Sequence, residues 1–115
     1  MRVAALTPPM LNYWVAKSRG VTAVLDHRAE HSLSLVDPES GKLVPYQPSL
    51  DWSQAGPILA DEWYEIETVM LDWFGPFWSF MDAFKANPLA WFMRAYVAAK
   101  FGEEVEMVHP EEQDA

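Results

Sequence analysis

The residues of this chain best suited to chemistry lie close together, between Tyr46 and Pro57. If Tyr46 and Trp52 expose rigid aromatic faces, the segment forms a binding surface, because such anchors supply contact area at a small entropy cost. Asp51 then fixes the orientation of a ligand through a charged hydrogen bond. The candidate binding residues of this segment are Tyr46, Pro48, Ser49, Asp51, Trp52, Gly56 and Pro57.

A purely structural role for the same residues is the alternative. In this interpretation Trp52 fills the core, while Asp51 caps either a turn or the helix that Gly56 and Pro57 begin, as short acidic side chains do. The sequence leaves both interpretations open. The exposure of the Trp52 side chain decides between them.

Arg94 is the one candidate from a distant segment. It faces away from the apolar stripe of Leu89, Phe92 and Tyr96, on a helix with few other polar side chains at mid-length. A guanidinium pairs with carboxylates and phosphates in a forked geometry. Arg94 is therefore expected either to form a structural ion pair, for which Asp51 is one candidate, or to contact a carboxylate or phosphate of a ligand.

Catalytic and metal-binding patterns are weak in this sequence. Ser49 and Ser53 lie near Asp51, but the three histidines belong to other segments and no glycines flank either serine as in a nucleophile elbow. His27 and His31 have a zinc-ligand spacing without an obvious third ligand, and no cysteine or glycine-rich phosphate loop is present. We therefore predict no catalytic residues, no metal and no cofactor.

The charge balance narrows the classes of partner. Seventeen acidic residues against eight basic ones give the 115-residue chain a net charge of -9. Such a charge repels a phosphate backbone and favours encounters with cationic partners, so direct binding to nucleic acid is disfavoured. The length predicts a single domain over residues 1–115. Without a long apolar run or a signal-peptide pattern, the expected location is the cytoplasm of the host cell, with no membrane contact.

The first element that must position these residues is a helix over residues 8–19. Thr7 is a plausible cap, Pro8 suits the first helical position, and Gly20 follows the end. A weak strand signal over residues 21–25 comes next, interrupted by charge over residues 26–31. Ser32–Val36 and Lys42–Tyr46 then flank a connector rich in turn residues, a pattern that predicts a β-hairpin.

The middle of the chain is harder to assign. Three prolines and a glycine between Pro45 and Pro57 predict an ordered loop. The β-branched and aromatic content of residues 62–69 favours a strand, although Pro57 with Asp61 and Glu62 is also typical of a helix start. Residues 77–84 are aromatic enough to be buried in either conformation.

The last helix has the clearest pattern. Asn87 and Pro88 suit its start, Gly102 suits its end, and its apolar residues share one face. Alternating acidic and apolar residues over 104–107 predict a half-buried strand, and residues 109–115 a frayed tail. The summed expectation is an α+β fold in which two amphipathic helices pack on a small, mostly antiparallel sheet.

Three segments, in the same order, resemble the NinX-like family of phage and prophage proteins. The segment 45–59 is similar to the family's Tyr-x-Pro-Ser-x-Asp-Trp-x-x-x-Gly-Pro-Ile pattern. Residues 11–17 are similar to its opening, and residues 93–105 to its ending. The chain departs from the pattern at Leu50, where a small hydroxyl residue is usual, and at Ala55, where glycine is common. Residues 69–86 match poorly.

This resemblance implies a biological setting and no particular reaction. Members of the family look like accessory proteins found in temperate-phage gene neighbourhoods. The first hypothesis is therefore a non-enzymatic module that binds a host or phage protein through the segment from Tyr46 to Pro57. The alternative is a small-molecule-binding or enzymatic domain with a pocket near Asp51, Trp52 and Arg94. The crowded aromatic residues between Trp73 and Phe84 also suggest a patch for a homo-oligomer.

Overall fold

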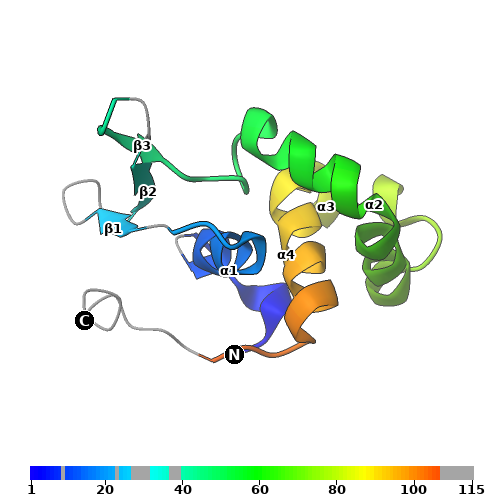
Figure 1. The fold of residues 1–115 in the computed structure, drawn as a ribbon. Helices are drawn as coiled ribbons and strands as arrows, with labels where there is room; N and C mark the ends of the chain where they lie inside the picture. Colours follow the sequence, from blue (N-terminus) through cyan, green and yellow to red (C-terminus); the bar gives the residue numbers. More distant parts are fainter. Residues whose placement is uncertain (9, 23, 27–31, 37–39, 107–115) are drawn as a thin grey trace.

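The fold is mostly helical, with a small antiparallel sheet at one side (Figure 1). The computed structural model describes residues 1–8, 10–22, 24–26, 32–36 and 40–106. Within these ranges the elements follow the order η1 (Val3–Ala5), α1 (Met10–Arg19), β1 (Val24–Asp26), β2 (Ser32–Val36), β3 (Leu43–Pro45), α2 (Trp52–Phe74), η3 (Trp78–Phe80), α3 (Asp82–Ala86) and α4 (Pro88–Phe101).

Helix α1 confirms the predicted first helix. The Leu11 amide donates to the Thr7 carbonyl at 3.0 Å, so the first helical bond already involves Thr7. At the other end Gly20 has a φ of 69°, a left-handed value that glycine adopts without strain. Leu11, Trp14 and Val15 are buried, as the spacing of the apolar residues predicts.

The predicted hairpin is also confirmed. Strand β2 pairs antiparallel with β3, and β1 completes a three-stranded sheet in the order β1-β2-β3. Strand β1 begins at Val24 and overlaps only the end of the predicted segment 21–25. Most of the hairpin turn and the charged residues 27–31 lie outside the described residues.

The expected ordered loop over residues 45–57 is confined to residues 46–51, and the expectation of a strand over 62–69 is wrong. Helix α2 begins at Trp52 and runs through both segments, and only residues 46–51 form the connection from β3. Ile58, Ile66 and Met70 recur at helical spacing and are buried, so the interior selects the helix despite the β-branched content. Pro57 lies in the second turn, and the backbone departs from helical angles at Glu62, where the helix is kinked.

Helix α4 confirms the predicted last helix. Asn87 occupies its N-cap position, although the Asn87 side chain makes no capping hydrogen bond. Gly102 ends the helix with a φ of 91°, and its amide donates to the Ala98 carbonyl at 2.8 Å. The half-buried strand expected after the helix reduces to an isolated bridge between Arg2 and Glu104. Residues 107–115 lie outside the described part.

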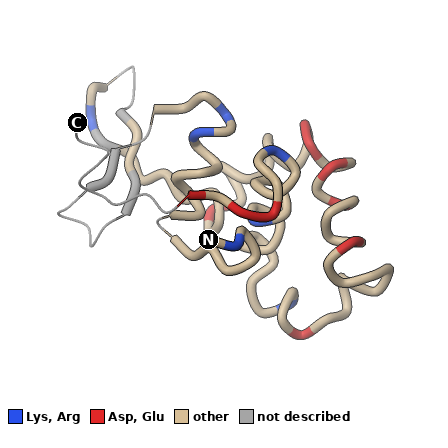
Figure 2. The backbone as a smooth tube through the Cα atoms, turned by 90° about the horizontal axis from the view of Figure 1, so that it is seen from below, with Lys and Arg blue, Asp and Glu red and all other residues tan. Residues whose placement is uncertain are grey.

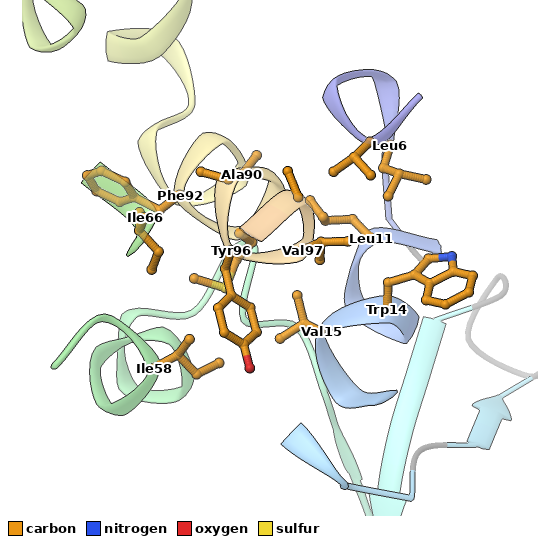
Figure 3. Close-up of a cluster of buried hydrophobic side chains, with 14 of the residues drawn as sticks. Leu6, Leu11, Trp14, Val15, Ile58, Ile66, Ala90, Phe92, Tyr96 and Val97 are labelled. Carbon is orange, nitrogen blue, oxygen red and sulfur yellow. The ribbon is translucent and has the colours of Figure 1, made fainter. Parts of the chain in front are cut away.

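The main core lies between helices, which corrects the expectation of two helices packed on a sheet. Helix α4 lies between α1 and α2 and packs against both, and η1 also packs against it (Figure 1). In the centre, Tyr96 of α4 points toward Ile58 of α2 and Val15 of α1 (Figure 3). Most of α4 is buried because it has neighbours on several sides. None of the helices among the described residues is long and apolar enough to cross a membrane.

Candidate functional site

Residues 46–51 are tied tightly to the first turn of α2. The Gln54 side chain both accepts and donates a hydrogen bond. Its Oε1 accepts from the Gln47 amide at 2.7 Å, and its Nε2 donates to the Pro45 carbonyl at 2.8 Å. The Gln47 carbonyl accepts from the amides of Leu50 and Asp51, each at 2.9 Å. The connection therefore has a defined shape, as the sequence predicted for an ordered loop.

The same segment is anchored to α1. The Ser49 amide donates to Oδ1 of Asn12 at 3.1 Å, and both residues are buried. Pro48 is also fully buried. Because Pro48 and Ser49 face the interior, the following residues are presented to solvent from a fixed base.

Asp51 has the capping role that the structural alternative assigned to it. Its Oδ1 accepts from the Ser53 amide at 2.9 Å and from the Ser53 hydroxyl at 2.6 Å. These two hydrogen bonds favour the ionised carboxylate and lower the pKa of Asp51. Asp51 thus starts α2 at Trp52 rather than near Gly56 and Pro57.

Trp52 does not fill the core. Its side chain is 58% exposed, and the preceding Leu50 is 62% exposed. Two large apolar side chains therefore stand on the surface, on either side of a capped helix start. This exposure agrees with the part of the binding interpretation that concerns Trp52, whereas the interpretation also required an exposed Tyr46, which is buried.

A shallow depression of about 150 Å³ adjoins these two side chains. Its lining residues come from the 46–51 connection, from the start of α2 and from the start of α4, and they are Ser49, Leu50, Trp52, Asn87, Pro88 and Leu89. Among the described residues, Trp14 Nε1 and Ser49 Oγ are the buried polar side-chain atoms without a hydrogen-bond partner. The Ser49 hydroxyl is thus an unsatisfied polar group in a residue that lines the depression.

Three other predicted residues of the segment are not surface anchors. Tyr46 is 7% exposed, and burial raises the pKa of its phenol to about 12, an effect that the charge of Arg19 partly offsets. Gly56 and Pro57 belong to α2 rather than to a loop. A methyl group placed at Gly56 would meet no atom within 4 Å, so no neighbouring group requires a glycine there.

Arg94 makes its contacts with other residues than those of this site. Its Nε donates to the Leu6 carbonyl at 2.8 Å, and its guanidinium stacks over the Trp91 ring at 4.4 Å from the ring centre. Burial lowers the pKa of Arg94. Within the described part of the chain it forms no ion pair, and it does not line the depression beside Trp52. The predicted pairing of Arg94 with Asp51 is therefore absent.

The acidic residues of α2 are partly neutralised by its neighbours. Figure 2 shows acidic positions recurring along this long helix. Arg19 of α1 contacts Asp61 at 3.0 Å, and Lys100 of α4 contacts Glu62 and Glu65, each at 3.1 Å. These contacts surround the kink at Glu62 and lie on a different part of α2 from Trp52.

A larger depression of about 300 Å³ lies where the two ends of the described chain meet. It is lined by Arg2, Ala4, Trp73, Glu103 and Glu104. None of the predicted site residues belongs to it. His27 and His31, the histidine pair weighed as metal ligands, lie outside the described residues.

Leu50, Asn87, Pro88 and Leu89 line the depression but were not singled out by the sequence as binding residues. Leu50 had a signal, because it is an apolar residue where the related pattern has a small hydroxyl residue. Asn87, Pro88 and Leu89 had none, since their place in the lining depends on how α4 packs against the start of α2.

The helices, the antiparallel sheet and this helix start define the chain as a small α+β protein with a surface tryptophan beside a shallow depression. Its sequence matches the family described as bacteriophage P22 NinX over residues 2–100. The chain therefore belongs to the bacteriophage P22 NinX family. The match also spans residues 69–86, where the sequence pattern alone gave no support. No curated protein and no solved structure matches the chain.

Proposed function

We propose that this phage protein is a non-enzymatic module that binds another protein, encoded by the phage or its host, through Leu50 and Trp52. The observation that carries the proposal is the exposure of Trp52, at 58%, on a rigid and capped helix start. Large apolar side chains carried by a backbone of fixed shape bind a partner at a smaller entropy cost, because the backbone need not be ordered on binding. Isolated exposed apolar residues are common on proteins, so the rigid base beneath this pair is an essential part of the proposal.

The enzymatic alternative receives less support from the geometry. It needs Asp51, Trp52 and Arg94 around one pocket, but the polar contacts of Asp51 are with Ser53 and those of Arg94 are with Leu6. The depression of about 150 Å³ is also below the range of about 300–1,000 Å³ typical of small-molecule sites. A side chain of a protein partner suits this volume better than a metabolite.

Affinity capture from phage-infected host cells tests the proposal. The wild type is compared with Trp52→Ala and with Tyr64→Ala, a control that removes another exposed aromatic side chain, 82% exposed, from the same helix. We expect Trp52→Ala to lose a protein that both the wild type and Tyr64→Ala retain. Recovery of the same proteins with all three baits would contradict the proposal.

A further inference from the structure

The short element η3 presents two aromatic rings to solvent. Phe77 and Phe80 are each 69% exposed, and their ring centres lie 6.4 Å apart. The Phe80 amide donates to the Phe77 carbonyl at 3.0 Å, which closes a 3₁₀ turn. Residues three apart in such a turn stand on the same side, so the backbone of η3 holds the two rings together on one surface.

Trp78, between these two residues, holds η3 against the helices. Its ring packs edge-on against Phe84 and Phe92, with ring centres 5.1 and 5.9 Å away. It also contacts the ring of Trp63 in α2, which is 39% exposed, at 6.2 Å. The exposed aromatic area therefore continues from η3 onto α2.

We call this area the η3 surface, and its residues are Trp63, Phe77, Trp78 and Phe80. None of them lines the depression beside Trp52. Exposed apolar surfaces bordered by polar residues are typical of sites where another molecule binds. The residues at the border then determine what kind of molecule that is.

The border of the η3 surface is acidic. Residues 61–84 include six acidic residues and no basic one. Basic residues of α1 and α4 pair with three of the six. The other three, Glu67, Asp72 and Asp82, form no ion pair within the described part of the chain, and the first basic residue after them is Lys85.

The three unpaired carboxylates lie close to the aromatic residues in the chain. Glu67 is one helical turn after Trp63 in α2, Asp72 lies near the end of the same helix, and Asp82 begins α3 directly after η3. Figure 2 shows acidic positions along α2. An occupant of the η3 surface is therefore in reach of negative charges on the elements before and after it.

This charge selects one kind of occupant. A second copy of the chain brings the same net charge of -9 and the same carboxylates, so it is repelled. An anionic membrane surface is repelled for the same reason. A positively charged segment is attracted to the carboxylates, and its lysines and arginines also interact favourably with the faces of exposed aromatic rings.

We infer that the η3 surface binds a positively charged amphipathic segment of another protein. The apolar side chains of that segment cover Phe77, Phe80 and Trp63, and its basic side chains face Glu67, Asp72 and Asp82. This is a second binding surface, and it does not depend on the proposed function of Leu50 and Trp52.

Peptide titration of the full chain tests the inference. The probe is a capped amphipathic peptide with leucines on one helical face and lysines on the other. We follow it by ¹⁵N NMR of the indole N–H groups of Trp63 and Trp78, each assigned by its loss in the corresponding Trp→Phe variant. We expect both resonances to shift saturably, while that of the buried Trp14 stays in place. A peptide with glutamates in place of the lysines should bind at least about tenfold more weakly.

The aromatic part of the surface is tested with the double variant Phe77→Ser with Phe80→Ser. It should bind the lysine peptide at least about tenfold more weakly, because the two rings supply most of the apolar contact. Both rings are exposed, so the Tm of the double variant should stay close to that of the wild type. The control Trp52→Ala should bind the peptide as the wild type does.

The acidic border is tested with a matched pair of double variants. Asp72→Asn with Asp82→Asn should weaken binding by about 2- to 10-fold, since two nearby charges are lost. Glu103→Gln with Glu106→Gln removes the same charge from exposed residues after α4, and it should change binding by less than about twofold.

Four outcomes would overturn the inference. They are no shift of the Trp63 and Trp78 indoles at millimolar peptide, unchanged binding in the serine variant, equal weakening by the two charge variants, and equal binding of the glutamate peptide. Weaker peptide binding in Trp52→Ala would also contradict it, because the peptide would then occupy the surface of the proposed function. Partner capture that depends on Trp52 tests the proposed function separately.

Discussion

At the residue scale, Trp52 and Trp14 have opposite relations to the interior. Trp52 is 58% exposed and Trp14 is 7% exposed. We therefore expect Trp52→Ala to change the free energy of unfolding by less than about 1 kcal/mol, whereas Trp14→Ala should cost about 3–5 kcal/mol. Chemical denaturation of both variants measures this. A loss of several kcal/mol in Trp52→Ala would mean that the indole supports the fold. Failure of this variant to capture a partner would then reflect unfolding and would give no evidence of a binding surface.

Tyr46 gives a prediction at high pH. Burial raises its pKa from 10.0 in the unfolded chain to about 12 in the folded protein. The folded state therefore holds the phenol proton more tightly, so the stabilisation is complete below pH 10, decreases between pH 10 and 12, and is lost above that. A shift of this size corresponds to about 2–3 kcal/mol.

The measurement is denaturation as a function of pH in the wild type and in Tyr46→Phe, which lacks the phenol. We expect the wild type to lose more stability than the variant over this interval. Parallel curves for the two proteins would show that the Tyr46 phenol ionises in the folded state as it does in the unfolded chain.

At the scale of elements, two glycines should respond oppositely to the same substitution. Gly102 ends α4 with a φ of 91°, whereas Gly56 lies inside α2, and an added methyl meets no atom within 4 Å at either. Backbone conformation alone then determines whether each substitution raises or lowers the free energy of unfolding. Gly102→Ala should destabilise the protein by about 1–2 kcal/mol, and Gly56→Ala should stabilise it by about 0.5–1 kcal/mol.

Thermal unfolding of the two variants checks these signs, and partner capture with Gly56→Ala adds a functional reading. If Gly56→Ala keeps the partner, the glycine belongs to the helix and not to the binding surface. A stabilising Gly102→Ala would contradict the positive φ at the end of α4.

At the scale of the whole molecule, the aromatic surplus is divided between core and surface. Trp78 and Phe84 pack edge-on against Phe92 of α4, with ring centres 5.9 and 5.2 Å away. Phe77 and Phe80 are each 69% exposed, with ring centres 6.4 Å apart. The sequence-based expectation of a homo-oligomer therefore has one definite surface to test.

We expect association through Phe77 and Phe80 to be weak, because the pair is small and two copies each carry a charge of -9. Salt screens that repulsion, so the mass from light scattering should rise with protein concentration and with added salt. The double variant Phe77→Ser with Phe80→Ser should remain monomeric. A wild type that stays monomeric at high protein concentration in high salt would contradict this prediction.

The sequence predicted those elements whose local signals and apolar patterns agree. Helices α1 and α4 have proline near their starts, a glycine directly after their ends and apolar residues at helical spacing. The hairpin of β2 and β3 has strong turn residues between its strands. The segment from Trp52 to Met70 was assigned wrongly because its local signals disagree. Its β-branched and aromatic residues favour a strand and Pro57 suits only the start of a helix, whereas the buried face of Ile58, Ile66 and Met70 selects one continuous helix.

The candidate site divides in the same way. The pattern around Asp51 and Trp52 was visible in the sequence, because aromatic, acidic and proline residues are crowded there. The tertiary structure decided that the Trp52 indole faces solvent, that Ser49 lacks a partner and that Asn87 lies beside it. Exposure and proximity depend on which elements pack together, and the helices α1, α2 and α4 that bring these residues together are far apart in the chain. Local sequence sets the conformation of a segment, and long-range packing sets what its side chains face.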